Sequence, residues 1–262
     1  MHTEADIRKF MNQQSEYQRT HFYIEATLKV EPLWLSYDSL LFLATAFDVN
    51  LGMGHTPKDV VFDPMDAFFG FTPFVEARFE PFYARFGLDH RCFHEIDQKE
   101  LPTVYWNMMF LSAHTENARL TDFAQRVLID SSMGWKERIA MGVKGGYFMK
   151  KFFGLVRESS VDYENDRRAE FEVMARVLAL RVKRWAFTSE AHTKWGSYRQ
   201  PDKEESKLYW RQTLCIQAIH RSPIGKIMYL FVRGSLDDMP LHHDQPRFTR
   251  SKLIELGIGV GL

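Results

Sequence analysis

Apolar side chains at helical spacing over residues 160–187 constrain the fold of this chain more than any other sequence feature. They recur at steps of three and four residues: Phe171, Met174, Leu178, Val182 and Trp185. On a helix such residues share one face, which would pack against a core. Shorter segments with similar patterns predict further helices, so the expected total is five to seven.

Two segments are predicted as strands instead. Residues 21–30 alternate between apolar and polar side chains, which is typical of a strand with one wet face. Residues 224–233 are apolar or aromatic on both faces, which indicates a central strand. Because these segments lie near opposite ends of the chain, the two ends are expected to meet in one small sheet. The predicted fold class is therefore α+β and predominantly helical.

Phenylalanine is unusually abundant, with 22 residues in a chain of 262. Residues 66–86 contain seven of them, and Pro73 and Pro81 are expected to break this segment into short helical pieces. Large rings at this density fill a core or an interface. One hypothesis is therefore a structural or assembly protein with an aromatic interface at residues 66–86.

The charge is divided unevenly along the chain. Residues 1–133 carry 11 Lys and Arg against 19 Asp and Glu, or −8, whereas residues 134–262 carry 23 against 15, or +8. A single domain over 1–262 is expected, with a possible subdivision into these acidic and basic halves. Complementary halves could also dock on each other in self-association, or on a protein partner.

The basic half suggests contacts with nucleic acid. Lys203, Lys207 and Arg211 are spaced four apart on a helix predicted over 202–220, where they would form one cationic stripe. The loop before it interleaves cations and rings: Lys194, Trp195, Tyr198 and Arg199. Cations neutralise phosphates and rings stack on bases, although a solvated helix shows the same stripe. The leading hypothesis is a non-enzymatic, nucleic-acid-binding or regulatory protein, with DNA and RNA equally open.

A second hypothesis concerns the segment from Asp89 to Asp97. On a helix, His90 and His94 would lie one turn apart, as paired zinc ligands do. This arrangement favours a metal-dependent enzyme, with hydrolysis as the default reaction and a divalent metal as the possible cofactor. Cys92 stands between the two histidines, which can activate a thiol, although such a cysteine is more often a buried packing group. No other cofactor is predicted, because the phosphate-loop, dinucleotide and nucleophile-elbow motifs are absent.

The expected compartment is the cytoplasm. Cys92 and Cys215 are interpreted as reduced thiols, and the first residues lack the basic and apolar blocks of a signal peptide. The longest uncharged run, residues 101–115, is too short to cross a bilayer as a helix. No transmembrane segment is therefore predicted.

Overall fold

The computed structural model describes most of the chain, and nearly all of that part is β-sheet. The described residues are 2–11, 22–38, 40–55, 63–95, 104–129, 134, 136–149, 166–199, 206–237 and 251–261. The strands are β1 (His2–Phe10), β2 (Phe22–Glu31), β3 (Leu33–Tyr37), β4 (Leu41–His55), β5 (Asp63–Phe79), β6 (Phe82–Glu95), β7 (Val104–Thr115), β8 (Ile139–Phe148), β9 (Asp166–Val182), β10 (Trp185–Arg199), β11 (Ser206–Arg221), β12 (Ile227–Asp237) and β13 (Ser251–Gly261). Between β7 and β8 lie helix α2 (Leu120–Ile129) and the short turn η1 (Lys136–Arg138).

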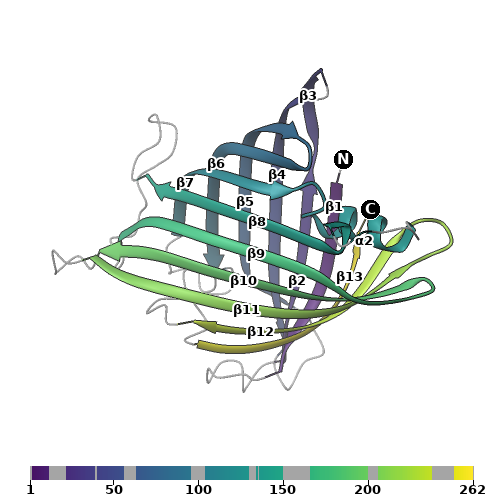
Figure 1. The fold of residues 1–262 in the computed structure, drawn as a ribbon. Coiled ribbons are helices and arrows are strands. Elements are labelled where there is room, and N and C mark those ends of the chain that lie inside the picture. Colours follow the sequence, from purple (N-terminus) through teal and green to yellow (C-terminus); the bar gives the residue numbers. More distant parts are fainter. Residues whose placement is uncertain are drawn as a thin grey trace.

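These strands close into a barrel (Figure 1). Apart from β2 and β3, each strand pairs antiparallel with its sequence neighbours, and β1 pairs with β13, which joins the two ends of the sheet. Strand β3 continues β2 past Pro32, and both pair with β4. The described wall is therefore a closed antiparallel barrel of twelve strands. Closure pairs both edges of every strand of the described wall except β3, which pairs with β4 alone.

The two ends of the barrel differ in their connections. One end carries the short turns at 38–40, 80–81, 183–184 and 222–226, together with α2. The start of β1 lies at this end too, because Glu4 pairs with Gly261 of β13. We call it the short-turn end. The other connections span 12–21, 56–62, 96–103, 150–165, 200–205 and 238–250, outside the described residues, and join the strands at the opposite end, the long-connection end.

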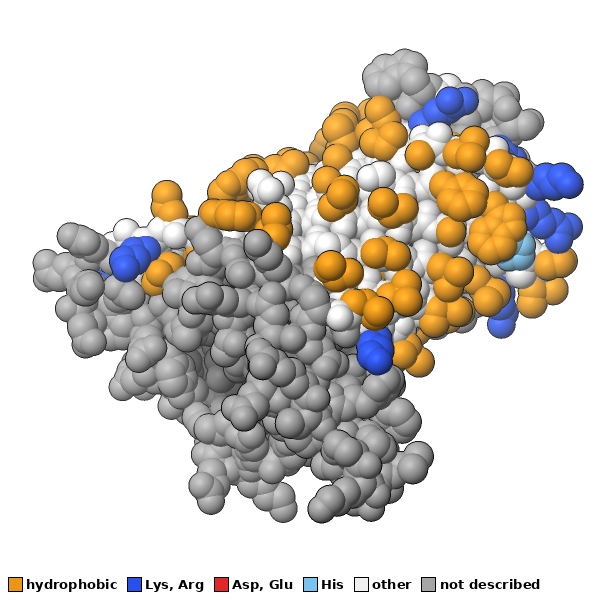
Figure 2. All heavy atoms as spheres, turned by 90° about the horizontal axis from the view of Figure 1, so that it is seen from below, with side chains coloured by type: hydrophobic (Ala, Val, Ile, Leu, Met, Phe, Trp, Pro, Cys, Tyr) orange, Lys and Arg blue, Asp and Glu red, His pale blue; other side chains and the backbone are white. Residues whose placement is uncertain are grey.

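The outer face of the wall is apolar. Along β13 the side chains of Leu256, Ile258 and Val260 are 44–50% exposed, whereas the intervening Gly257 and Gly259 are buried. Figure 2 shows one side of this wall: its described side chains are mostly apolar, no Asp or Glu is visible, and Lys and Arg lie toward the margins. A soluble protein shows the opposite arrangement, with polar side chains facing outward.

The interior is filled from one end by α2. Its apolar face packs against inward-facing side chains of β8, β10, β11 and β12, in a cluster that includes Phe123, Val127, Ile219 and Phe231. Glycine occurs in the wall where a large ring from the next strand lies against it: a Cβ on Gly259 would come within 2.3 Å of the Tyr229 ring. Glycine at such positions therefore lets the rings of β12 occupy the lumen.

The predominantly helical α+β prediction is wrong. The segment on which this prediction depended is strand β9. The residues expected to share one helical face lie on both faces of this strand: Phe171 points outward and Met174 inward. An irregularity in the β9–β10 pairing near Thr188 shifts the alternation, so spacings of three and four arose from a bulged strand. Residues 206–221 are likewise a strand, β11. Strands do lie at both predicted strand positions, as β2 and β12, but as two members of a large barrel.

Within the described residues, no helix is long and apolar enough to cross a membrane.

Candidate functional site

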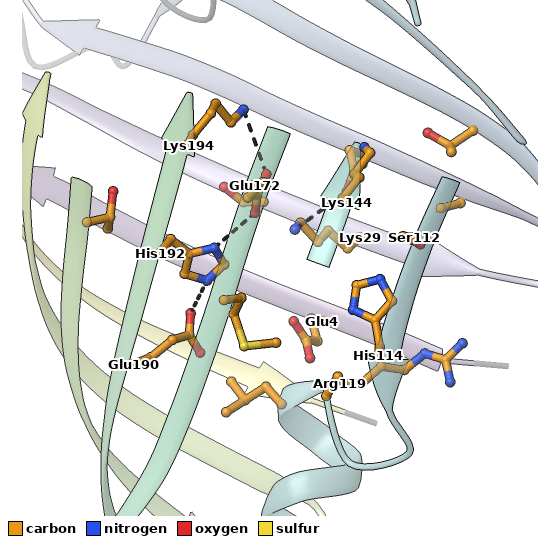
Figure 3. Close-up of a pocket in the computed structure, with 18 of the residues that line it drawn as sticks. Glu4, Lys29, Ser112, His114, Arg119, Lys144, Glu172, Glu190, His192 and Lys194 are labelled. Carbon is orange, nitrogen blue, oxygen red and sulfur yellow. Dashed lines mark hydrogen bonds and ion pairs between the residues drawn. The ribbon is translucent and has the colours of Figure 1, made fainter. Parts of the chain in front are cut away.

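The lumen contains a polar cavity of about 640 Å³. Its lining comes from strands all around the barrel and includes Lys, Arg, Asp, Glu and His side chains (Figure 3). Ionisable groups removed from bulk water must be paired to be tolerated. Single pairs, such as Arg233 with Glu255 at 2.9 Å, and three larger sets of contacts pair them in this lumen.

The first set lies near α2. Arg85 donates from Nη1 and Nη2 to the two carboxylate oxygens of Glu31, at 3.2 and 3.1 Å, and from Nε to Glu76, at 2.9 Å. Arg119, just before α2, donates to Glu31 at 2.9 Å and to Glu76 at 3.3 Å. Because Arg119 comes from the β7–α2 connection, this set fixes the start of α2 against the wall.

The second set centres on Asp89 of β6, which is 2% exposed. Its carboxylate accepts hydrogen bonds from Arg91 at 2.8 Å, from Lys144 of β8 at 2.8 Å and from Thr72 of β5 at 3.2 Å. Lys144 belongs to the basic half of the sequence and Asp89 to the acidic half, so this contact neutralises charge between the halves.

The third set is a chain along β9 and β10, which Figure 3 shows as dashed contacts. Lys194 lies 2.9 Å from Glu170 and 3.9 Å from Glu172. His192 contacts Glu172 through Nδ1, at 3.0 Å, and Glu190 through Nε2, at 2.8 Å. Carboxylates can only accept in these bonds when ionised, so both ring nitrogens carry hydrogen and the imidazole is cationic. Arg176 also donates to Glu190.

The residues predicted to bind nucleic acid do not form one exposed surface. Lys194 and Arg211 are opposite each other on β10 and β11 and line the lumen cavity. Lys207 is exposed near the start of β11, and Lys203 lies outside the described residues. These cations therefore fail to form the predicted exposed stripe.

The aromatic members of that set separate in the same way. Tyr198 is buried against Tyr209, with ring centroids 6.2 Å apart. Trp195 faces outward, 45% exposed and stacked on Phe171, while Arg199 ends β10. A closed barrel with an apolar outer face and with Lys194 and Arg211 in its lumen contradicts the nucleic-acid-binding and regulatory prediction.

The aromatic segment at 66–86 covers β5 and the start of β6, and it also divides between the faces. Phe69 and Phe71 are 41% and 42% exposed on the outer wall, whereas Phe68 and Phe74 are buried on the inner side. The outward rings belong to the apolar belt around the whole barrel. Residues 66–86 therefore form no separate aromatic patch, and the hypothesis of an assembly interface there is not supported.

A polar cluster lies on the outer wall of β6 and β7. His90, Cys92 and His94 have the same outward orientation as Phe86, and none of them lines the lumen cavity. His90 is opposite Asn107 of β7, and its Nδ1 is 2.7 Å from the Asn107 Oδ1. His94 packs edge-on against Phe69, with centroids 5.6 Å apart. Cys92 is half-buried and forms no disulfide.

The metal-site prediction depended on a helix that is absent. Residues four apart on a strand are separated by about 13 Å, so His90 and His94 do not lie side by side as zinc ligands would. Among the described residues, no group of three or more His, Cys, Asp or Glu side chains could hold a metal ion. The metal-dependent enzyme is therefore not supported.

Sequence reasoning missed the lumen residues Glu31, Glu76, Arg85 and Lys144, and it missed Asn107. A usable signal was present at the centre of β9, where charged and apolar residues alternate over residues 169–173, with Glu170, Phe171 and Glu172 in succession. A period of two over such a length is typical of a barrel strand with a polar inner face and an apolar outer face.

No family model and no curated protein matches this chain. Solved structures do. The outer membrane phospholipase of Salmonella typhi, described as a dimer with bound calcium, is similar with a TM-score of 0.57 and 8% identity, over 100% of this chain and 90% of that one. Outer membrane phospholipase A of Escherichia coli is similar with a TM-score of 0.56 and 9% identity, over 100% and 92% of the two chains. At such identities the similarity shows a shared fold.

This shared fold and the apolar outer wall correct two further predictions. A closed barrel crosses a membrane with its strands, so the expectation that the chain has no transmembrane segment is wrong. The cytoplasmic location is contradicted for the same reason, since the fold is that of outer-membrane barrels.

Proposed function

We propose that this chain is an integral outer-membrane β-barrel whose lumen is closed to free diffusion. The observation that carries the proposal is the inverted wall: exposed apolar side chains such as Ile7, Leu230 and Ile258 surround a lumen of paired charges. Hydrocarbon is the solvent in which such a wall is stable, and a closed barrel satisfies every backbone hydrogen bond within it. The twelve strands also fit the even number found in bacterial barrels.

The connections give an orientation. Outer-membrane barrels have short periplasmic turns and longer extracellular loops. The short-turn end, with α2 and the start of β1, is therefore assigned to the periplasm, and the long-connection end to the cell exterior.

Closure of the lumen is supported by two observations. Helix α2 buries Phe123, Ala124 and Val127 completely against the inner wall at the short-turn end. Beside it, Arg119 and Arg85 bind Glu31 and Glu76 across that part of the lumen. An open diffusion pore keeps a water-filled channel, whereas here a packed helix and desolvated ion pairs occupy one end.

The test is reconstitution of the full chain into lipid vesicles and planar bilayers. We expect heat-modifiable migration in gels, protection of the wall from proteases, and no steady conductance. The double variant Phe123→Ser and Val127→Ser should release α2 and produce conductance, whereas Gln125→Ser, on the exposed side of α2, should not. Failure of the folded chain to enter bilayers, or a steady open conductance of the wild type, would contradict the proposal.

A further inference from the structure

Among the described strands, β3 alone lacks a neighbour on one side. It pairs with β4 through residues 33–37, and no described strand pairs with its other edge. Strand β1 would be its neighbour there, but the pairing of β1 with β2 begins at His2 and Glu31, before β3 starts. Because backbone groups point alternately to the two sides of a strand, half of the N–H and C=O groups of β3 point away from β4 toward an open edge.

Strand β3 projects past the barrel wall at the short-turn end. Figure 1 shows β3 and the start of β4 extending beyond the start of β1. Strand β2 contributes ten residues, which at a tilt of about 45° span roughly 23 Å along the membrane normal. The apolar band of an outer-membrane barrel is about 25 Å tall, so β3 continues β2 into the water on the periplasmic side. This placement rests on the proposed function, which assigns the short-turn end to the periplasm.

The side chains of this projecting strand are apolar and exposed. Leu33, Leu35 and Tyr37 are 52%, 67% and 75% exposed, and residues 32–37 include no charged side chain. Natural edge strands are protected by lysine, proline, a bulge or a covering segment. An uncharged apolar strand with an open edge in water is the template to which an extended segment of another protein adds as a further strand.

The orientation of β3 argues against a second copy of this chain as the occupant. Two barrels inserted the same way in one membrane are related by an axis along the membrane normal, so their β3 strands run in the same direction. Such an axis places identical residues at the same height, whereas the slanted hydrogen bonds of a parallel ladder join residues at different heights. Two β3 edges would therefore meet out of register, and antiparallel pairing would require one barrel to be inverted.

We propose that the open edge of β3 binds an extended apolar segment of a water-soluble periplasmic protein, which adds antiparallel to β3. Main-chain hydrogen bonds hold the segment, and its alternate side chains cover Leu33, Leu35 and Tyr37. Asp38, exposed where the hairpin turns, is the one charged residue between positions 32 and 47. It favours a basic residue at the start of the segment, which an antiparallel arrangement places beside it.

The experiment uses the full chain in lipid nanodiscs, which leave both ends of the barrel open to solution. The probe is the fluorescein-labelled peptide Lys-Val-Thr-Val-Thr-Val-Thr. We expect saturable binding by fluorescence anisotropy and slower hydrogen exchange of the amides in residues 33–37. Two control peptides carry N-methyl groups on the odd or on the even amide nitrogens. One of these sets faces β3, and the peptide methylated there should bind at least about 10-fold more weakly, because its strand donors are lost.

A charge on the open edge should also weaken the docking. Leu35→Lys adds the kind of side chain that protects natural edge strands, and the exposure of Leu35 makes the change tolerable to the fold. It should lower the affinity for the peptide at least about 10-fold. Leu208→Lys is the matched control, because Leu208 is equally exposed but lies near the start of β11, at the long-connection end. It should leave the affinity unchanged.

The outcomes separate the two proposals. A chain that inserts in the nanodiscs but binds no peptide, or that is protected by the peptide outside residues 33–37, overturns the docking site and leaves the barrel assignment intact. Equal affinities for all three peptides also overturn it. Amides of residues 33–37 that exchange slowly without peptide would show that the edge is already covered, by a second copy if single-copy nanodiscs release them, and would overturn it too. A chain that never enters lipid overturns the barrel assignment itself.

Discussion

The inner and outer faces of the same strands follow opposite rules. On β12, Met228, Leu230 and Val232 face outward and are 44–50% exposed, whereas Tyr229 and Phe231 are buried in the lumen. Outside, apolar side chains are stable because their neighbour is hydrocarbon; inside, charges are stable because other charges neutralise them. One strand therefore tolerates arginine on one face and isoleucine on the other. The cluster at His90 and Asn107 is notable because it breaks the outer-face rule.

The largest effect is expected inside the lumen. Arg85→Ala removes the one arginine that contacts both Glu31 and the 2%-exposed carboxylate of Glu76 at 3.1 Å or less, and leaves Arg119 to neutralise both, which should lower the free energy of unfolding by about 3 kcal/mol. Urea unfolding in vesicles, followed by tryptophan fluorescence, measures it. Arg78→Ala is the control: Arg78 also contacts Glu76, but it is 44% exposed and should matter far less. Equal losses for both would show that burial does not set the strength of these pairs.

A charged side chain on the outer wall should lower the free energy of unfolding, although charged side chains are stable in the lumen. Ile258 pairs with Ile7 and Leu230, and all three face outward. Ile258→Arg should cost up to about 2–4 kcal/mol in the same unfolding assay, because this position lies farther from the strand ends than Leu236 and its outward neighbours are apolar. Leu236→Arg, close to the long-connection end, should cost about 0–1 kcal/mol. Without such a dependence on depth, the wall is not embedded in lipid.

A smaller loss in the free energy of unfolding is expected where an aromatic ring packs closely against a glycine of the wall. Gly259→Ala places a Cβ 2.3 Å from the Tyr229 ring, and the resulting overpacking should cost about 1–3 kcal/mol. Gly234→Ala is the matched control, since no heavy atom lies within 4 Å of the added Cβ. Combining Gly259→Ala with Tyr229→Leu should cost less than the sum of the single changes, and strict additivity would argue against the contact.

The smallest effect is expected for a surface ion pair near α2. Arg126 donates to Glu116 at 2.6 Å, but their side chains are 46% and 28% exposed. Arg126→Ala should therefore change the free energy of unfolding by no more than about 1 kcal/mol. A loss comparable to that of Arg85→Ala would mean that geometry alone, without burial, governs the pairs of this barrel.

Part of the fold could be predicted from the sequence. Alternation over residues 21–30 indicated a strand, which is β2. The two predicted strands, β2 and β12, lie in one sheet, but the ends of the chain meet there through β1 and β13, which were not predicted as strands. The other strands were not recognised. In β9, for example, the inward-facing Met174 and a bulge interrupted the alternation of polar and apolar residues that is typical of a strand.

The sequence identified the polar cluster on the outer wall of β6 only as a group of residue types. The sequence placed His90, Cys92 and His94 together, but a helix was assumed, and the helix led to a metal. On a strand the same spacing separates the two histidines and turns Cys92 toward the same face. Asn107 comes from the next strand, 17 positions along the chain, a contact that no local pattern could reveal.

By itself, the sequence determined the residue types of each strand, the abundance of rings and the unequal charge of the two halves. Tertiary structure decided which solvent each face meets. Closing β1 against β13 creates an inside and an outside at once, so alternating side chains pair their charges in an enclosed lumen or meet hydrocarbon. The physical reason is that the sign of a side chain's transfer energy depends on its surroundings, and only closure of the barrel defines those surroundings.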